Sequence, residues 1–362
     1  MRVVVADQHT DLPAPAGWSE HAVVPVDGVP TRFGMAHVPR TAFDPTADYN
    51  RDHVLLRLKA FALGRWRDLL TRRHDDVLGP HRGLGVDFVA EVVATGTNVT
   101  RFQPGQRVIP CPDWPADTGA PGTRGLVTCT ASREYARLPA ASLICVGSAI
   151  GDKAAAALSA SASTGFALVR RADPSRGSRV LVCGGASGTS LATVAALVNR
   201  GLRPALHGVP RRHLRRVDQL GIADLVDPDG TSFAQAHRLA REVGGFATVI
   251  DVSGTTQGIR SAVALLGLGG SYLTCTPPAG GGADDYADVL HRLVIRGASL
   301  TGVHLGTRAD LVEALRWADE SGWRPAVDDV YTDGDLATFV EHQFGEFPRF
   351  GDAVFTYSDS GA

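Results

Sequence analysis

The feature of this 362-residue sequence that most limits its fold is a regular alternation of strand-like and helix-like segments between residues 151 and 304. Short apolar runs rich in β-branched residues alternate there with stretches of roughly 10 to 15 residues that have helical spacing. This rhythm is typical of a doubly wound parallel sheet, whose helices cover both faces. The expected strands are residues 179–184, 203–207, 224–226, 247–252, 271–275 and 298–304.

The sequence before residue 151 has a different pattern, with short β-branched and aromatic runs broken by Gly and Pro. Because no long amphipathic helix separates these runs, they predict a mainly β domain. A single helical stretch is expected over residues 152–172, and the mixed pattern returns near the end of the chain. We therefore expect an α/β protein with a mainly β domain of residues 1–155 and 305–362 and a doubly wound domain of residues 156–304. Outside the doubly wound domain the expected strands are residues 53–60, 86–96, 107–109, 133–138, 326–331 and 353–357, and the expected helices are residues 308–320 and 334–342.

The composition argues against several classes of partner. The 36 Lys and Arg residues and 38 Asp and Glu residues leave a formal net charge of −2, so there is no basic surplus to bind nucleic acid or an anionic membrane surface. The sequence contains no run of about 18 apolar residues, which is the length that a membrane-spanning helix needs. The five cysteines are odd in number and widely spaced, which favours neither a disulfide framework nor a zinc knuckle and fits a reducing, cytoplasmic compartment.

The most informative motif is a Gly-rich turn between an apolar strand and an apolar-periodic helix. At such a turn, backbone N–H groups and the helix dipole point at the place where a pyrophosphate binds. The full Gly-x-Gly-x-x-Gly pattern is not present, because Ser190 stands where the last glycine is expected. A turn in a parallel sheet that binds nothing is the alternative. The candidate cofactor-binding residues of this turn are Gly185, Ser187, Gly188, Thr189 and Ser190.

The end of the second expected strand bears on the choice between NAD and NADP. NAD-binding sheets present an Asp or Glu there to the 2′-hydroxyl of the ribose. This sequence has no acid in reach and presents Arg211 and Arg212, whose guanidinium groups suit a 2′-phosphate. We therefore expect NADP(H). The alternative is that both arginines are solvated residues that open a basic helix.

Two further pairs of residues follow strands of the expected parallel sheet. Val252 and Ser253 come at the end of the fourth strand, and Thr274 and Thr276 lie at the end of the fifth. Because ligands bind at the carboxyl ends of strands in such sheets, these four residues are candidate cofactor contacts.

In this order, the motifs resemble the medium-chain dehydrogenase/reductase superfamily, especially its zinc-free quinone oxidoreductase and enoyl reductase-like branches. The resemblance covers residues 53–357 and implies a GroES-like catalytic domain, a Rossmann domain and a nicotinamide cofactor. It also implies that Thr164 lies under the nicotinamide ring. The segments that carry it are residues 85–96, 102–108, 134–140, 163–165, 306–311 and 324–328.

This sequence differs from the zinc alcohol dehydrogenases of the superfamily at the positions that bind the metal. At the three places where those enzymes have zinc ligands, this sequence has Phe61 or Ala62, Val86 with Asp87, and Ala160. One carboxylate cannot form the three-ligand site that catalytic zinc needs. The four closely spaced cysteines of a structural zinc lobe are also missing. The sequence therefore predicts an enzyme without metal.

Without a Lewis acid to polarise a carbonyl, direct alcohol oxidation loses its usual driver. Conjugate reduction needs less polarisation of the carbonyl than alcohol oxidation does. Hydride attacks the β-carbon of an enone, enoyl thioester or quinone, and correct positioning of the cofactor supplies much of the rate. The resemblance therefore implies reduction of an activated C=C bond, with an activated carbonyl as the nearest variant. The small-molecule substrate could be a biosynthetic intermediate, which relatives in this branch can receive tethered to a carrier protein.

The candidate catalytic residues are Trp66, Arg67 and Asp87. Trp66 replaces a tyrosine that relatives carry beside the nicotinamide, and it donates a hydrogen bond but cannot supply a proton. Plain packing of Trp66, an ion pair between Arg67 and Asp68, and an orienting role for Asp87 are the alternatives. Near the C-terminus, Asp352 stands where relatives have a cofactor-binding lysine, and so it would repel the phosphates or point away from them. Arg349 is the candidate to replace that lysine.

Three departures, at Ser190, Trp66 and Asp352, leave a second class of function open. In that class the chain keeps the nucleotide pocket but acts as a redox-neutral enzyme or a non-catalytic binding subunit. Retention of Arg211 and Arg212 favours the enzyme. The resemblance also implies a homodimer in which edge strands at residues 299–304 pair between subunits.

Overall fold

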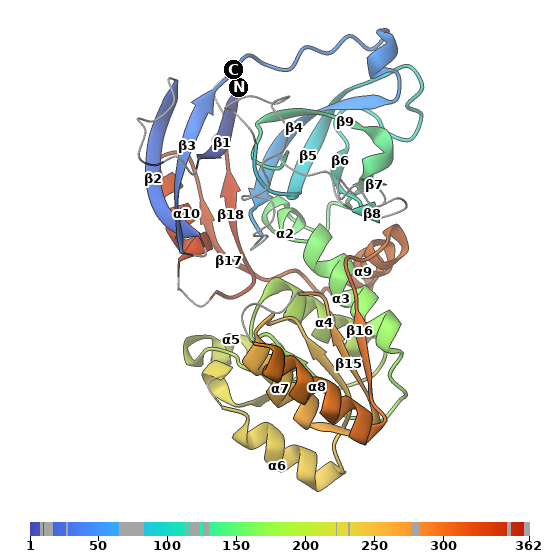
Figure 1. Cartoon of the computed structure of the whole chain (residues 1–362). Coiled ribbons are helices and arrows are strands. Elements are labelled where there is room, and N and C mark those ends of the chain that lie inside the picture. The colour runs from blue at the N-terminus through green and yellow to red at the C-terminus, as the bar shows by residue number, and fades with distance from the viewer. Residues whose placement is uncertain are drawn as a thin grey trace. The chain divides into compact units, whose positions relative to one another are not determined.

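A computed structural model gives the fold of the chain in two compact units (Figure 1). The first unit is Met1–Ala160 with Arg324–Ala362, and the second is Ser161–Trp323. The structure describes residues 1–7, 10, 17–26, 28–64, 83–112, 114–115, 124–125, 130–221, 223–230, 232–276, 282–345 and 349–357.

The second unit contains a six-stranded sheet in which every pair of neighbouring strands is parallel. The strand order is β13-β12-β11-β14-β15-β16, so the chain first builds outward from β11 in one direction and then in the other. This confirms the doubly wound sheet expected from the sequence, and it places a switch point between β11 and β14. The strands are β11 (Val180–Cys183), β12 (Ala205–His207), β13 (Asp224–Val226), β14 (Phe246–Asp251), β15 (Leu266–Thr274) and β16 (Ser299–Gly302).

Helices cover this sheet and pack through small and branched side chains. Figure 1 shows α7 and α8 beside each other over one face, where Ile259, Val263 and Leu293 join a buried cluster with the strand residues Leu181 and Val249. The helical stretch expected at residues 152–172 is broken into α2 and α3. The helices are α2 (Asp152–Ala156, in the first unit), α3 (Ser159–Ala172), α4 (Gly188–Asn199), α5 (Leu214–Asp218), α6 (Ala234–Val243), α7 (Thr256–Ala264), α8 (Ala283–Arg296) and α9 (Arg308–Ser321).

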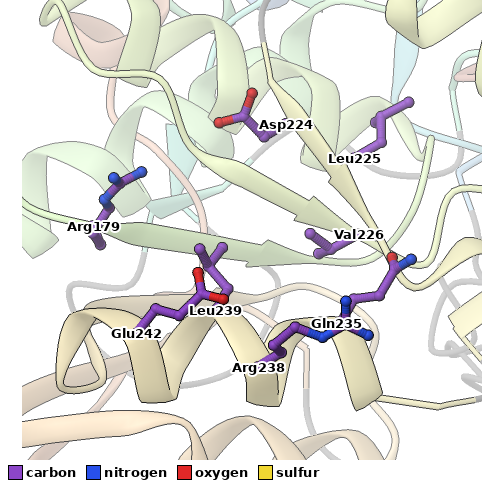
Figure 2. A pocket seen from close by; sticks show the side chains of 8 residues that line it. All are labelled: Arg179, Asp224, Leu225, Val226, Gln235, Arg238, Leu239 and Glu242. Carbon is purple, nitrogen blue, oxygen red and sulfur yellow. The ribbon is translucent and has the colours of Figure 1, made fainter.

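A cavity of about 380 Å³ lies beside the edge strand β13 (Figure 2). Two arginines and two acids line it together with apolar groups. One of the acids, Asp224, forms an ion pair with Arg203, with 2.8 Å between Oδ1 and Nε. None of the cofactor residues expected from the sequence lines this cavity, so it is distinct from the candidate site. The lining residues are Arg179, Asp224, Leu225, Val226, Gln235, Arg238, Leu239 and Glu242.

The first unit begins with a three-stranded antiparallel sheet that the sequence pattern did not predict. Its order is β1-β3-β2, with β1 (Arg2–Asp7), β2 (Trp18–Val26) and β3 (Val29–His37). Six consecutive residues of β3 are buried, so the strand lacks the alternation that marks a half-exposed strand. Phe33 of β3 stacks on Phe344, with ring centroids 5.0 Å apart.

The second sheet of the first unit brings together strands from both ends of the chain. Its order is β10-β6-β5-β4-β18-β17, and β9 pairs with β4. Six of its strands correspond to those expected from the sequence, whereas β10 was not expected. The strands of the sheet are β4 (His53–Ala62), β5 (Asp87–Thr95), β6 (Arg107–Pro110), β9 (Tyr135–Pro139), β10 (Leu143–Cys145), β17 (Val327–Tyr331) and β18 (Asp352–Thr356); β7 (Trp114–Pro115) and β8 (Arg124–Gly125) form a separate small pair.

Aromatic side chains form the core of the first unit. Phe61 of β4 contacts Phe339 of α10 (Leu336–Phe344) and Phe355 of β18, with ring centroids 5.9 and 5.3 Å away. Each ring is fully buried and contributes about 1.5 to 3 kcal/mol by leaving water. The last helix and strand of the chain are therefore part of this core.

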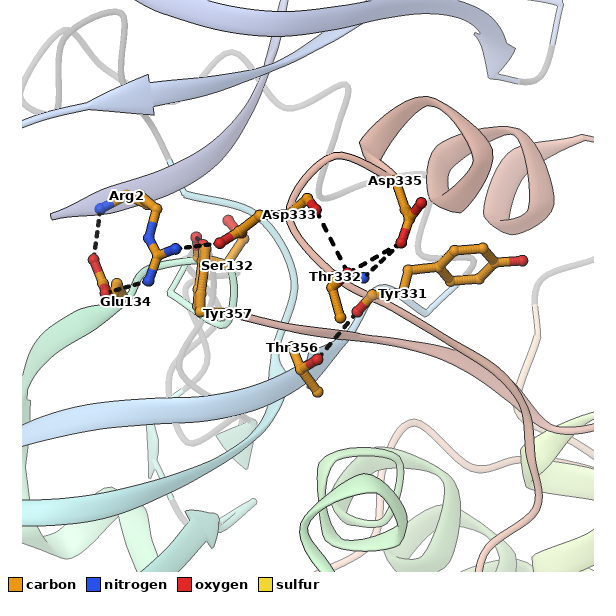
Figure 3. Close-up of polar contacts among 9 residues, drawn as sticks. All are labelled: Arg2, Ser132, Glu134, Tyr331, Thr332, Asp333, Asp335, Thr356 and Tyr357. Atoms are coloured by element: carbon orange, nitrogen blue, oxygen red, sulfur yellow. Dashed lines mark hydrogen bonds and ion pairs between the residues drawn. The ribbon is translucent and has the colours of Figure 1, made fainter. Parts of the chain in front are cut away.

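Arg2 connects β1 to two other parts of the first unit (Figure 3). Its Nη2 donates to Glu134 Oε1 at 2.7 Å, its Nη1 donates to Asp333, and its guanidinium lies 5.0 Å from the ring centre of Tyr357. Burial raises the pKa of Glu134, but the hydrogen bonds and charge of Arg2 outweigh it and hold that pKa below its usual range. The Tyr357 hydroxyl donates to the carbonyl of Ser132, which completes the connection.

No helix in the described ranges has the length and apolar character needed to cross a membrane.

Candidate functional site

The Gly-rich turn after β11 brings three backbone segments into close contact. Gly184 and Gly185 have φ values of 139° and 61°, which favour glycine. A Cβ atom on Gly184 would lie 2.4 Å from Cγ2 of Val252, and one on Gly185 would lie 2.7 Å from the carbonyl oxygen of Gly208. The turn therefore needs glycine at both positions, and it lies against the loops that follow β12 and β14.

Helix α4 begins directly after this turn. The Ser187 Oγ accepts a hydrogen bond from the N–H of Ser190 at 3.3 Å and lies 2.8 Å from the Ser190 Oγ. Ser190 is fully buried, so it fills the space where the sequence pattern expects a glycine. The other N–H groups of the first turn, including those of Gly188 and Thr189, have no partner within the helix and carry its positive dipole end. This arrangement fits the pyrophosphate of a dinucleotide.

The residues expected at the strand ends lie beside the same turn. The N–H of Val252 donates to the carbonyl of Cys183 at 2.9 Å, and the Thr276 Oγ1 donates to the carbonyl of Val252 at 3.4 Å. Thr274 Oγ1 donates to the carbonyl of Thr276 at 3.1 Å. The loops after β11, β14 and β15 are thus joined, and the sequence-predicted residues Val252, Thr274 and Thr276 lie in one place.

An acid that the sequence analysis did not select as a site residue lies directly before Val252 at this edge. Asp251, the last residue of β14, is fully buried and accepts hydrogen bonds from the N–H of Ser253 and the hydroxyl of Tyr272, both at 2.8 Å. Burial first, and then the charge of Asp251, raise the pKa of Cys183 and of Tyr272 well above their usual ranges. Burial also raises the pKa of Cys275 to about 11. These three groups keep their protons at neutral pH, so none of the three is a thiolate or phenolate nucleophile there.

The ribose end differs from the sequence expectation that no acid lies in reach of the two arginines. Asp229 accepts hydrogen bonds from the backbone N–H of Arg211 at 2.8 Å and from its Nε at 2.9 Å. The acid comes from the loop after β13, 18 positions along the chain, where the turn sequence Pro228-Asp229-Gly230 was the available signal. This contact occupies Nε of Arg211, so its two terminal guanidinium nitrogens are available to bind a phosphate. Arg212 is exposed, and its Nε lies 3.1 Å from Nε2 of the buried His213.

Thr164 lies in α3, where it is 4% exposed. Its neighbour Gly165 allows α3 to approach α4 closely, because a Cβ there would lie 2.6 Å from the backbone nitrogen of Thr193. The candidate catalytic residues Trp66 and Arg67 lie outside the described residues.

Asp87 begins β5 and is buried, with 5% of its surface exposed. Its Oδ1 accepts a hydrogen bond from the backbone N–H of Ala160 at 2.9 Å. Burial raises the pKa of Asp87 from 3.8 to about 7; the Ala160 hydrogen bond opposes this effect and the charge of Asp352 adds to it. Asp87 is therefore a carboxyl group that can hold or release a proton near neutral pH.

The described residues at the three positions compared with zinc ligands do not fit a zinc ion. Ala62 is the register partner of Asp87 on β4, and Ala160 supplies the hydrogen bond above, so the three positions compared with zinc ligands do lie together. Two of them are buried alanines, which have no ligand atom. Within the described ranges, no group of three or more His, Cys, Asp or Glu side chains could hold a metal.

Two C-terminal residues singled out in the sequence have definite places in the first unit. Asp352 is the first residue of β18, and its N–H donates to the carbonyl of Ala326 at 3.1 Å. Arg349 donates through Nη1 to the side chain of Gln343, which in turn donates to the carbonyl of Leu63.

Comparison with known proteins agrees with this architecture. Residues 50–148 match the model of the alcohol dehydrogenase GroES-like domain. No curated protein matches the sequence. Among solved structures, an NAD-dependent alcohol dehydrogenase superposes with a TM-score of 0.76 at 23% identity, covering 94% of this chain and 100% of the other.

Two further structures extend the comparison. The 2R,3R-butanediol dehydrogenase from Bacillus subtilis has a TM-score of 0.69 at 18% identity, covering 90% of this chain and 96% of its own. A cobalt- and zinc-bound thermostable alcohol dehydrogenase from Pyrobaculum aerophilum has a TM-score of 0.72 at 20% identity, covering 94% and 99%. At such identities the likeness concerns the fold. The chain therefore combines a segment that matches the alcohol dehydrogenase GroES-like domain with a Rossmann-like parallel sheet, and it shares its fold with these solved dehydrogenases.

Proposed function

We propose that the chain is a zinc-independent, NADPH-dependent oxidoreductase that reduces an activated C=C bond in an enone, enoyl thioester or quinone, or an activated carbonyl. The observation that carries the proposal is the Gly-rich turn at the switch point of the parallel sheet, where Gly184 and Gly185 keep the backbone open beside the start of α4. A biosynthetic intermediate, free or tethered to a carrier protein in the cytoplasm, is the proposed substrate.

The proposed cofactor contacts are those of the second unit. The turn and the start of α4 hold the pyrophosphate, Arg211 and Arg212 hold the 2′-phosphate, and Thr164 lies under the nicotinamide. Val252, Ser253, Thr274 and Thr276 border the dinucleotide from the neighbouring strand ends. When bound, NADPH supplies hydride.

The preference for an activated C=C bond follows from the residues around Asp87. Ala62 and Ala160 provide no metal ligand there, and one carboxyl group cannot act as a Lewis acid. A conjugated substrate needs less polarisation, since its electrons move to an oxygen that a hydrogen-bond donor can stabilise. A protonated Asp87 is such a donor.

The proposal is tested first by titrating NADPH and NADH against the purified protein. We expect NADPH to bind more tightly than NADH, and Arg211→Ala/Arg212→Ala to weaken NADPH binding about 10- to 100-fold, because charge-assisted hydrogen bonds to phosphate are lost. Asp229→Asn should tighten NADPH binding, since it removes a negative charge beside the 2′-phosphate. Calorimetry or nicotinamide fluorescence measures each dissociation constant.

Arg215→Ala is the matched control, because Arg215 is an exposed arginine on α5 just beyond the proposed phosphate site. It should leave both affinities within about twofold of the wild type. Equal binding of the two nucleotides would contradict the NADP assignment. Binding of neither would contradict the reductase and favour the redox-neutral enzyme or binding subunit.

We also propose that the chain forms a homodimer through the β16 edge of its second unit. Tyr286, Leu290 and Val294 recur every four residues on α8, so they share a helix face, and they are 38%, 61% and 79% exposed. Leu300 on the edge strand β16 is 48% exposed. An open edge strand next to an exposed apolar helix face is suited to pairing with a second copy and is otherwise an aggregation hazard.

The dimer is tested with Leu290→Asp/Val294→Asp. We expect the wild type to elute as a dimer and the double variant as a monomer in size-exclusion chromatography with light scattering, because two charges would have to be buried. Leu220→Asp is the control, since Leu220 is 48% exposed and lies just beyond α5. A monomeric wild type would refute the dimer.

A further inference from the structure

Two acids lie on one face of the large sheet in the first unit. Asp87 of β5 is the register partner of Ala62 on β4, and Ala62 is the register partner of Val354 on β18. Cross-strand partners point to the same face, and so do residues two apart on one strand. Asp352 therefore shares the face of Asp87, with only Ala62 and Val354 between them in the register, both of them buried.

The carboxyl group of Asp87 has one oriented oxygen and one that remains for a ligand. Oδ1 accepts the N–H of Ala160 at 2.9 Å, whereas Oδ2 has no hydrogen-bond partner among the described residues. A proton on this carboxyl group therefore belongs on Oδ2. The hydroxyl of Ser159, next to Ala160 in the chain, is buried and likewise has no partner in the described part of the structure. An unpaired buried hydroxyl such as that of Ser159 costs free energy unless a ligand uses it.

The charges around Asp87 come from its own strand, from β4, β6 and β18, and from α2. Asp152 is engaged in ion pairs with Arg107 and Lys59. Among these groups, Asp352 is the one whose charge disfavours the ionised form of Asp87 and raises its pKa. The titratable and charged side chains on these elements are His53, Arg57, Lys59, Glu91, Arg107, Asp152, Lys153 and Asp352.

We propose that Asp87 Oδ2 gives the proton that completes reduction of the substrate, and that Asp352 is the positioning residue that keeps this proton on Asp87. The inference deepens the proposed function and rests on it. It gives a role to Asp352, which stands where relatives have a lysine.

The step balances as follows. When bound, NADPH would supply hydride for a new C–H bond at the β-carbon of an enone, and the electron pair of the C=C bond would move to give an enolate. The O–H bond of Asp87 breaks, and its proton goes to the enolate. Asp87 is left as a carboxylate, which takes a new proton from water. The negative charge of Asp352 favours that reprotonation.

The acid pair is tested without cofactor or substrate by 13C NMR of the full chain labelled at the aspartate carboxyl carbons. The Asp87 signal, assigned by its loss in Asp87→Asn, should titrate near neutral pH. In Asp352→Asn its ionisation constant should rise about tenfold, because a neighbouring negative charge is removed. Asp329→Asn is the control, since Asp329 is an exposed acid on the adjacent strand β17. An unchanged Asp87 titration in Asp352→Asn would overturn the role of Asp352.

The proton transfer is tested with NADPH and 2-cyclohexenone. Asp87→Asn should lower kcat about 100-fold with little change in NADPH affinity, because a general acid is lost. In Asp352→Asn the alkaline fall of kcat should move to lower pH together with the NMR midpoint. An unchanged kcat in Asp87→Asn refutes the proton donor while leaving the reductase intact. Failure to bind NADPH refutes the reductase, and the NMR titration still tests the acid pair.

Discussion

Replacing Gly165 by Ala is expected to destabilise the second unit by about 3 kcal/mol and to weaken NADPH binding at least about tenfold. A Cβ atom at this position would lie 2.6 Å from the backbone nitrogen of Thr193 and 2.8 Å from the carbonyl carbon of Ala192. Both are backbone atoms of α4, so no side-chain rotation can relieve the clash. Because α4 starts at the Gly-rich turn, displacing it moves the N–H groups that we assign to the pyrophosphate.

Urea unfolding and NADPH titration measure the two effects. Gly147→Ala is the control, since Gly147 is exposed, lies away from the proposed cofactor and dimer contacts, and a Cβ there meets no atom within 4 Å. It should change the free energy of unfolding by less than about 0.5 kcal/mol. A Gly165→Ala protein as stable as this control would show that the close contact of α3 with α4 can relax.

Asp87→Asn is expected to become more stable relative to the wild type as the pH rises. The pKa of Asp87 is about 7 in the folded protein, against an ordinary 3.8, so the folded state binds more protons than the unfolded state between these values. The free energy of unfolding of the wild type therefore falls through this range and levels off above it. The full difference is about 4 kcal/mol, and asparagine, which does not ionise, avoids it.

Urea unfolding at about pH 5 and about pH 8.5 gives the comparison. Asp329→Asn removes an exposed acid from the same unit and should follow the wild type at both pH values. If Asp87→Asn lost as much stability at the higher pH as at the lower one, Asp87 would titrate as an ordinary exposed acid. The proton-donor inference would then lose its basis.

The architecture was predictable because its signals are local in sequence. The alternation of β14, α7 and β15 appears in the sequence as strand, helix and strand, and right-handed parallel packing leaves few other arrangements. The Gly-rich turn was also predictable, since positive φ values at Gly184 and Gly185 need glycine. The first sheet was not, because β3 is buried along most of its length and so lacks alternation.

The electrostatics of the candidate site could not be predicted, because they depend on pairs distant in sequence. Asp229 contacts Arg211 from the loop after β13. Tyr272 on β15 donates a hydrogen bond to Asp251 on the neighbouring strand β14. Asp352 shares a sheet face with Asp87 only because β18 returns to pair with β4. Sequence reasoning identified Asp87 and Asp352 separately, and only the register of the sheet connects them.

The protonated state of the buried thiols bears on the substrates that we propose. Enones and quinones alkylate cysteine thiolates, so an enzyme that binds them risks modifying itself. Cys183 is buried beside the carboxylate of Asp251, and Cys275 has a pKa of about 11. The thiolate is the reactive form, and at neutral pH both residues are almost entirely thiols. Burial at the nucleotide edge, to which the charge of Asp251 adds, thus also protects these cysteines from the electrophiles that such a reductase would bind.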